Sequence, residues 1–209
     1  MVKTDPALRK RMMAQRDRNK RQGVSVNKSD WKKGTIRLLP CLGREVGRSF
    51  YSAYYEEERK SITLPKSFGY PDPLLDYVNA TEGTGTKEAK QHLKDTLSVT
   101  REHWVPCIIR GDEGTASAPN VRAFRFPLKT YEDSILDWMV DEDIGEDVTD
   151  AREGRDVFVS KSGEGLKTKW KVQKLDPSLI SKSKEMRAKL AAIAKGFDVA
   201  DHFFPFSLE

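Results

Sequence analysis

The chain has 209 residues, of which 37% are hydrophobic and 33% charged, and its formal net charge is +5. This length suits one sizeable domain with extensions or two small domains. Without a long apolar run or an N-terminal apolar segment, the sequence predicts neither a membrane span nor a secretory signal. Cys41 and Cys107 lie far apart in the sequence, which predicts two free thiols in a reducing compartment.

The charges are strongly segregated along the chain. Residues 1–28 carry a net charge of +7, whereas residues 132–153 carry a net charge of −9. The first of these segments opens with Asp5 as a possible helix N-cap and Pro6 at the first helical position, but its apolar stripe is thin. We therefore expect a basic N-terminal arm, which is either a solvated tail or a segment that binds a polyanion.

The hydrophobic pattern after the arm predicts mainly strands. Alternating segments indicate strands at 34–40, 48–58, 101–110, 121–126, 155–161 and 168–175, with the last two forming a hairpin. An insertion at 59–98 is expected to contain one helix from Leu74 to Ala80 and another over 87–97.

Two further helices are predicted after the insertion. The first covers 130–143, with Thr130 and Asp133 as a capping box and an apolar stripe of Tyr131, Ile135, Trp138 and Met139. The second covers 181–195 and ends at Gly196, before an aromatic C-terminus.

This order of elements favours a mainly β fold with helices, in which a five-stranded OB barrel carries an inserted helical subdomain and flanking helices. An SH3-like barrel would lack the helix at 130–143, and a ferredoxin-like fold would place a helix after the first strand. We expect a basic arm at 1–28, an OB domain at 29–178 with its insertion at about 59–98, and a C-terminal helix and aromatic tail at 179–209.

Aromatic residues alternate with Lys and Arg in the predicted strands, a combination that suits single-stranded nucleic acid. An aromatic platform contributes about 1–3 kcal/mol per stacked base, while basic side chains follow the phosphates. In the strand at 48–58, Phe50 and Tyr54 share one face and Tyr51 and Tyr55 the other, so one pair is expected in the core. The candidate DNA-binding residues are Arg37, Arg48, Tyr51, Tyr54, Tyr55, Trp104, Arg125, Lys161, Lys167, Lys169, Trp170 and Lys171.

Trp170 has two open interpretations. Strict alternation places it with Thr168 and Val172, opposite Lys169 and Lys171. It either caps the barrel core while the lysines face the ligand, or serves as a stacking platform itself.

The segments DWKKGTIRLLP (30–40), VRAFRFP (121–127) and RDVFVSKSGEGLKTKWKVQKL (155–175) resemble the single-stranded DNA-binding proteins of tailed phages, of the T-even helix-destabilising type. The resemblance covers roughly residues 29–176, and the hairpin is its most specific part. It implies an OB-fold protein that coats single-stranded DNA in phage replication, recombination and repair, in the cytoplasm of the infected bacterial host. It also implies that the arm contacts neighbouring protomers and that Arg37, the aromatic residues of 50–55, Lys167, Lys169 and Trp170 line the cleft.

The sequence departs from that family in two places. The T-even protein holds zinc in its insertion, but residues 59–98 here contain no Cys and a single His, His92, so we expect no zinc and no other cofactor. The family tends to end in a long acidic tail, whereas this sequence ends in DHFFPFSLE (201–209), whose final LE could be a cloning scar with native residues beyond it. Phe203, Phe204 and Phe206 either pack onto the barrel or contact replication proteins.

Enzymatic motifs are not found. The sequence has no P-loop, no G-x-S-x-G and no His/Cys set with metal-binding spacing, and helix-end solvation explains the acidic cluster at 141–150 more simply than a two-metal nuclease does. The sequence therefore predicts a non-catalytic binder of single-stranded DNA. The alternative is an RNA-binding OB module or a replication-scaffold protein.

Overall fold

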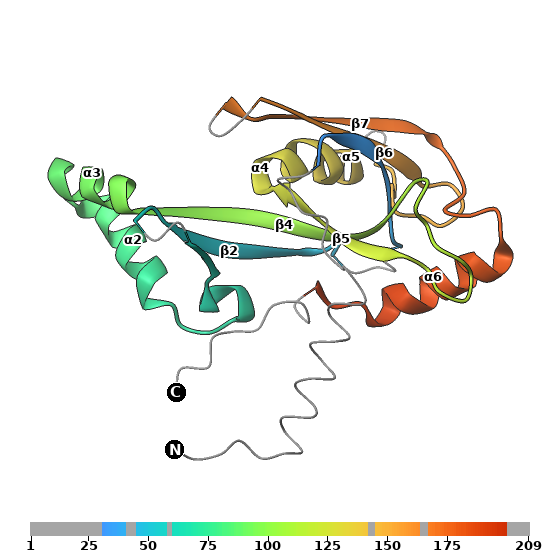
Figure 1. Ribbon diagram of the computed structural model, residues 1–209, viewed down its shortest axis with the longest axis horizontal. Coiled ribbons are helices and arrows are strands. Elements are labelled where there is room, and N and C mark those ends of the chain that lie inside the picture. The colour runs from blue at the N-terminus through green and yellow to red at the C-terminus, as the bar shows by residue number, and fades with distance from the viewer. Residues whose placement is uncertain (1–30, 41–44, 58–59, 142–144, 164–166, 200–209) are drawn as a thin grey trace, which may run out of the picture.

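The computed structural model describes residues 31–40, 45–57, 60–141, 145–163 and 167–199 (Figure 1). The strands are β1 (Lys33–Leu38), β2 (Arg48–Tyr55), β3 (Lys60–Thr63), β4 (Leu97–Ile109), β5 (Val121–Pro127), β6 (Arg155–Ser162) and β7 (Lys169–Pro177). The helical segments are η1 (Pro65–Phe68), α2 (Pro73–Thr84), α3 (Lys87–Thr96), α4 (Leu128–Tyr131), the π-helical turn η2 (Glu132–Leu136), α5 (Asp137–Val140) and α6 (Lys184–Gly196). The basic arm expected at 1–28 and the aromatic residues of 203–206 lie outside the described residues.

The fold is mixed α/β and is organised by one open, antiparallel sheet of seven strands. Its order is β3-β2-β4-β1-β6-β7, with β5 paired to the other edge of β4. Strand β4 is the longest, and β2 and β1 share one of its edges in succession. No ladder among the described residues joins β5 to β7, so the closed five-stranded barrel expected from the sequence is not found. Side chains make the contact instead, because the rings of Phe124 and Trp170 lie 6.4 Å apart in a T-shaped arrangement.

The main core lies between β1, β4, β5, β6 and the helical segment α4–η2–α5. Alternation along β1 buries Ile36 and Leu38, as the sequence predicts. The predicted helical stripe is also found, since Tyr131 and Ile135 are buried and Trp138 and Met139 are partly buried against the core. The predicted capping box is wrong: the helix begins two residues before Thr130, directly after Pro127, with no side-chain cap.

Residues 48–96 form what we call the inserted lobe, which contains β2, β3, η1, α2 and α3 and stands at one end of the molecule (Figure 1). Both predicted helices are present, and each has a side-chain cap: Asp72 accepts from the Leu75 amide at 3.0 Å, and Thr86 accepts from the Ala89 amide at 3.2 Å. The short strand β3 was not predicted. The lobe has its own small core, made of Ala53, Leu64, Leu75, Val78, Leu93 and Leu97.

The two faces of β2 contact different clusters, which modifies the expected division between a buried and an exposed aromatic pair. Phe50 is buried against Trp104, whereas Tyr54 on the same face is partly exposed. Tyr51 and Tyr55 pack against the core of the inserted lobe and are also partly exposed. Neither pair is wholly inside or outside, because one face of β2 contacts the cluster of Phe50 and Trp104 and the other contacts the core of the lobe.

The C-terminal part of the described chain covers the outer face of β4 and β5. Helix α6 begins at the Ser183 cap and packs Met186 and Leu190 against Ile108 and neighbouring apolar residues. The following segment places Val199 and Phe197 against the cluster that contains Phe50 and Trp104. None of the described helices is long and apolar enough to cross a membrane.

Candidate nucleic-acid interface

The β6–β7 hairpin presents lysine side chains around a glycine turn. Gly163 has φ of +77°, a left-handed conformation that favours glycine and starts the turn. The strands then pair Ser162 with Lys169, Lys161 with Trp170, and Ser160 with Lys171. The turn residues 164–166 lie outside the described part. The register fixes which hairpin side chains share a face.

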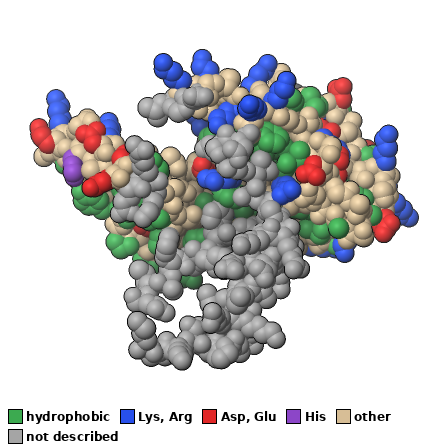
Figure 2. Space-filling view, in the orientation of Figure 1, with side chains coloured by type: hydrophobic (Ala, Val, Ile, Leu, Met, Phe, Trp, Pro, Cys, Tyr) green, Lys and Arg blue, Asp and Glu red, His purple; other side chains and the backbone are tan. Residues whose placement is uncertain are grey.

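Lys169 and Lys171 point away from the core and are exposed, as alternation predicts. Lys167 is exposed beside the turn, and Lys161 is partly buried on the inner face with Trp170. Lys33 of β1 pairs with Ser160 and therefore lies on the same outer face as Lys171. We call Lys33, Lys171 and Lys169 the lysine row. Blue side chains gather along the hairpin in Figure 2.

Trp170 is partly buried and packs edge-on against Phe124, with ring centroids 6.4 Å apart and an interplanar angle of 90°. Trp31 packs against the same Phe124 ring at 5.0 Å and donates from Nε1 to the Val159 carbonyl at 3.2 Å. Two tryptophans thus flank one buried phenylalanine beneath the lysine row. The ring therefore packs against the core on the face of β7 opposite Lys169 and Lys171 and stays partly exposed, and its use as a stacking platform stays a prediction.

The surface is hollowed between the inserted lobe and the hairpin (Figure 2), and β2 and β4 run beneath this interlobe hollow (Figure 1). Arg101 of β4 pairs with Tyr51 of β2, and its guanidinium carbon lies 5.1 Å from the Tyr51 ring centroid. On β4, Arg101 shares a face with Leu97, which packs against the lobe, and with His103, whose ring stacks on Tyr131 at 3.7 Å. The Tyr51–Arg101 stack therefore lies between α3 and α4, on the floor of the hollow.

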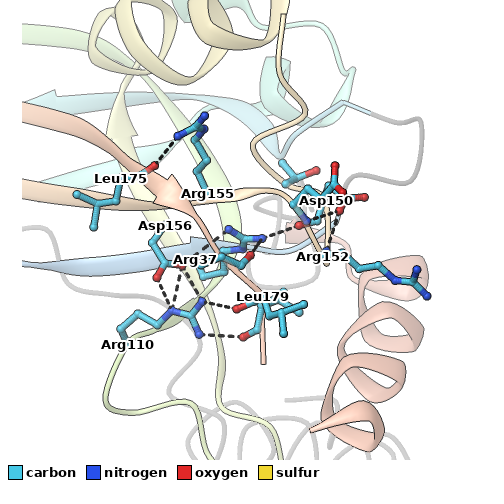
Figure 3. A network of polar contacts seen from close by, with 12 residues as sticks. Arg37, Arg110, Asp150, Arg152, Arg155, Asp156, Leu175 and Leu179 are labelled. Atoms are coloured by element: carbon cyan, nitrogen blue, oxygen red, sulfur yellow. Dashed lines mark hydrogen bonds and ion pairs between the residues drawn. The ribbon is translucent and has the colours of Figure 1, made fainter. Parts of the chain in front are cut away.

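Arg37, a predicted DNA contact, is instead wholly buried and holds parts of the chain together (Figure 3). Its guanidinium donates to the carbonyls of Asp150 at 2.5 Å and Ser178 at 3.1 Å, and lies 3.8 Å from the Asp156 carboxylate. Burial lowers the pKa of Arg37 to about 10. Alternation correctly turned Arg37 away from the main core, but other chain segments cover that face. Arg37 is therefore inaccessible to nucleic acid.

Arg110 completes the network around Asp156. It forms a bidentate pair with the carboxylate, with nitrogen–oxygen distances of 2.7–3.0 Å, and donates to the carbonyls of Leu179 and Ile180. The network joins β1, β4, β6 and the segment that leads to α6. Its arginines stabilise the fold and do not form part of the exposed basic surface.

Three other predicted contacts lie on the outer face of β2, β4 and β5. Trp104 is buried and therefore cannot serve as an exposed platform. Arg125 lies over the Trp104 ring at 4.6 Å and pairs with Glu102 at 2.5 Å. Arg48 donates to the Ser67 carbonyl at 3.0 Å and lies 3.7 Å from Asp198. Both arginines have acidic partners within the fold but keep part of their side chains exposed.

The acidic segment is also engaged in local contacts. Glu146 pairs with Arg155 at 2.5 Å and with Lys174 at 2.9 Å, and these hydrogen bonds lower the pKa of Glu146 to about 2. Lys174 in turn lies 5.7 Å above the Trp138 ring. No group of three or more His, Cys, Asp or Glu residues placed to hold a metal occurs within the described part of the chain.

His103 and Cys107 are both buried in β4. His103 contacts Ser49 Oγ at 3.0 Å and the Val46 carbonyl at 2.6 Å, and burial lowers its pKa. Burial raises the pKa of the Cys107 thiol to about 12. Both side chains are thus held neutral near pH 7 in enclosed positions, which is a structural arrangement rather than that of a nucleophile or a metal ligand.

No protein-family model matches the chain, and a search of curated proteins finds no match.

The structure adds exposed residues that the candidate set did not contain. Lys33 joins the hairpin lysines only through strand pairing between β1 and β6, which a single sequence does not reveal. Arg101 was noticed only as a basic neighbour of Trp104, and its stacking on Tyr51 depends on the register of β2 and β4. The spacing of Lys87, Lys90 and Lys94 in a predicted helix was visible in the sequence and could have been used.

Proposed function

We propose that this chain is a non-catalytic protein that binds single-stranded DNA without sequence preference. The observation that carries the proposal is the lysine row on the outer face of the hairpin, with the partly exposed Trp170 on its inner face and the Tyr51–Arg101 stack between the hairpin and the inserted lobe. Lysines neutralise phosphates, while aromatic rings and guanidinium planes accept bases. A duplex hides its base faces, so such a surface prefers single strands.

The order of the strands supports this proposal, because it is compatible with an OB-type architecture. The strands β5-β4-β1-β6-β7 follow one another as the strands of a five-stranded OB barrel do when it is opened between its third and fifth strands, and the α4–α5 segment precedes the final hairpin. In OB folds the loop between strands 1 and 2 and the loop between strands 4 and 5 contact oligonucleotides. The corresponding connections here are the segment that contains the inserted lobe and the turn between β6 and β7.

The biological setting that we propose is coating of single-stranded DNA during phage replication, recombination and repair. The N-terminal arm would then contact neighbouring protomers, and the C-terminus would contact replication proteins. The charge of the arm, +7 over residues 1–28, supports the first contact because residues 132–153 carry −9.

Competition at one fixed salt concentration tests the proposal. Fluorescently labelled oligo-dT bound to the protein is challenged with unlabelled oligo-dT, oligo-U or duplex DNA of equal length, and anisotropy is followed. We expect oligo-dT to compete far better than duplex. Equal competition by oligo-U would favour the RNA-binding alternative, and failure of labelled oligo-dT to bind would favour the scaffold alternative.

A further inference from the structure

Helix α3 carries a basic flank that the proposed hairpin site does not include. Lys87, Lys90 and Lys94 are spaced three and four residues apart, which places them along one side of the helix. The acidic residues of α3, Glu88 and Asp95, lie about a third of a turn away from the lysines, on the exposed side of the helix. The described residues provide no ion-pair partner for the three lysines. Lys87 and Lys94 are exposed and Lys90 is half-buried, so the basic side chains of this helix lie along one of its sides.

This basic flank stands across the interlobe hollow from the hairpin. In Figure 2, blue side chains lie at the upper edge of the inserted lobe with red side chains beside them, and further blue side chains lie along the hairpin, across the hollow. Leu93 anchors the buried side of α3, and β4 follows the helix without a loop, beginning at Leu97. Arg101 lies four residues further along the same face of β4, at a distance of about 13 Å from Leu97.

Arg101 lies between the lysine row and the lysines of α3, and it offers a different kind of contact. Tyr51 packs against the lobe core, and Arg101 lies 5.1 Å from its ring centroid. Because the side chain of Arg101 is exposed, its outer guanidinium plane is open to the hollow. Guanidinium planes stack on unpaired bases. Arg101 thus offers a stacking surface for a base, and the lysines on either side of the hollow offer contacts for phosphates.

We infer that the inserted lobe is a second contact surface for single-stranded nucleic acid, with Lys87, Lys90 and Lys94 on the phosphates and Arg101 stacked on a base. This inference rests on the proposed function and extends it, since the strand continues from the lysine row across the hollow to α3. An oligonucleotide that fills only the hairpin site gains nothing from the lobe. Longer oligonucleotides gain additional salt-dependent affinity.

A triple variant, Lys87→Gln with Lys90→Gln and Lys94→Gln, tests the phosphate contacts. Glutamine is a good helix former, so α3 is expected to remain folded, which far-UV circular dichroism verifies. On long oligo-dT the slope of log affinity against log salt should fall by about 2, or about 0.7 for each lost contact. On the shortest oligo-dT that binds, the slope should not change. The matched control replaces Lys182, Lys184 and Lys189, at and before α6, by Gln and should leave both slopes unchanged.

Arg101 is tested by two substitutions that separate charge from stacking. Arg101→Lys keeps the positive charge but removes the planar guanidinium group that would stack on a base. The affinity for long oligo-dT should therefore fall about two- to fivefold, with an unchanged salt slope. Arg101→Gln should also lower the slope by about 0.7. If the wild type binds oligo-dT and the lobe variants bind oligo-dT of every length with the same affinity and salt slope, the inference of a second contact surface is wrong, while the proposed hairpin site is unaffected. If the wild type does not bind single strands, both proposals fail.

Discussion

The lysine row makes a quantitative prediction about salt. Lys169 and Lys171 are exposed on the outer face of β7, so replacing both by Ala should remove two of the proposed phosphate contacts without opening a cavity. Each lost contact lowers the single-strand salt slope by about 0.7, so the double variant should lose about 1.4. Measured from a 1 M salt reference, this loss corresponds to about 65-fold weaker binding at about 50 mM salt and about tenfold at about 200 mM.

The assay is a fluorescence titration with oligo-dT at several NaCl concentrations, accompanied by thermal unfolding. Substitutions at two exposed strand positions should change stability by less than about 1 kcal/mol, so the variant binds as a folded protein. The control is Lys182→Ala with Lys189→Ala, which removes equal charge at and before α6, on the side of the molecule away from the inserted lobe (Figure 1). A loss that is constant across salt, or an equal loss in the control, would refute the assignment of these lysines to the phosphate path.

Three other predictions concern the aromatic core, the buried histidine and the arm. Trp170→Phe should keep the contact with Phe124 and lower the free energy of unfolding by less than about 3 kcal/mol, because the ring is only partly buried. The same substitution should reduce the fluorescence quenching caused by oligo-dT. Unchanged quenching would assign the signal to another tryptophan. In the folded protein the pKa of His103 lies below its ordinary value of 6.5, so as the pH falls this histidine takes up a proton in the unfolded chain before it does so in the folded protein. The free energy of unfolding should therefore decrease as the pH drops through about 6.5 towards the folded pKa, and urea midpoints of the wild type should show this loss. A His103→Gln variant with the same pH dependence would contradict the assignment. Deleting residues 1–28 should weaken binding to long strands much more than to an oligonucleotide that holds one protein; equal losses on both lengths would make the arm a simple phosphate clamp rather than a contact between protomers.

Local patterns were sufficient for most strands and helices. Alternation located β1 and the hairpin, and the helical stripe at Tyr131 and Ile135 located α4–α5, because the core imposes those periods on its residues. The exposure of Lys169 and Lys171 followed from the same alternation. These predictions depended only on one face of each element being buried.

The errors arose where a second layer covers the sheet. Alternation shows that Arg37 points away from the main core, but it cannot show that the segments around Asp150 and Ser178 enclose that face. Trp104 was expected to be accessible, yet the segment of Val199 covers it from about 95 residues further along the chain. A single sequence carries no signal for such contacts between distant segments. For the same reason, it does not reveal that β5 and β7 remain unpaired with each other among the described residues.

Acetylation of lysines in the presence and absence of oligo-dT tests the central claim most directly, because it maps the bound strand onto the protein. Mass spectrometry should show protection of Lys167, Lys169 and Lys171 by oligo-dT, with little protection by duplex DNA at the same salt and none at Lys182, Lys184 and Lys189. Hairpin lysines that react equally with and without oligo-dT would contradict the account, and so would hairpin lysines that duplex protects as well as a single strand does.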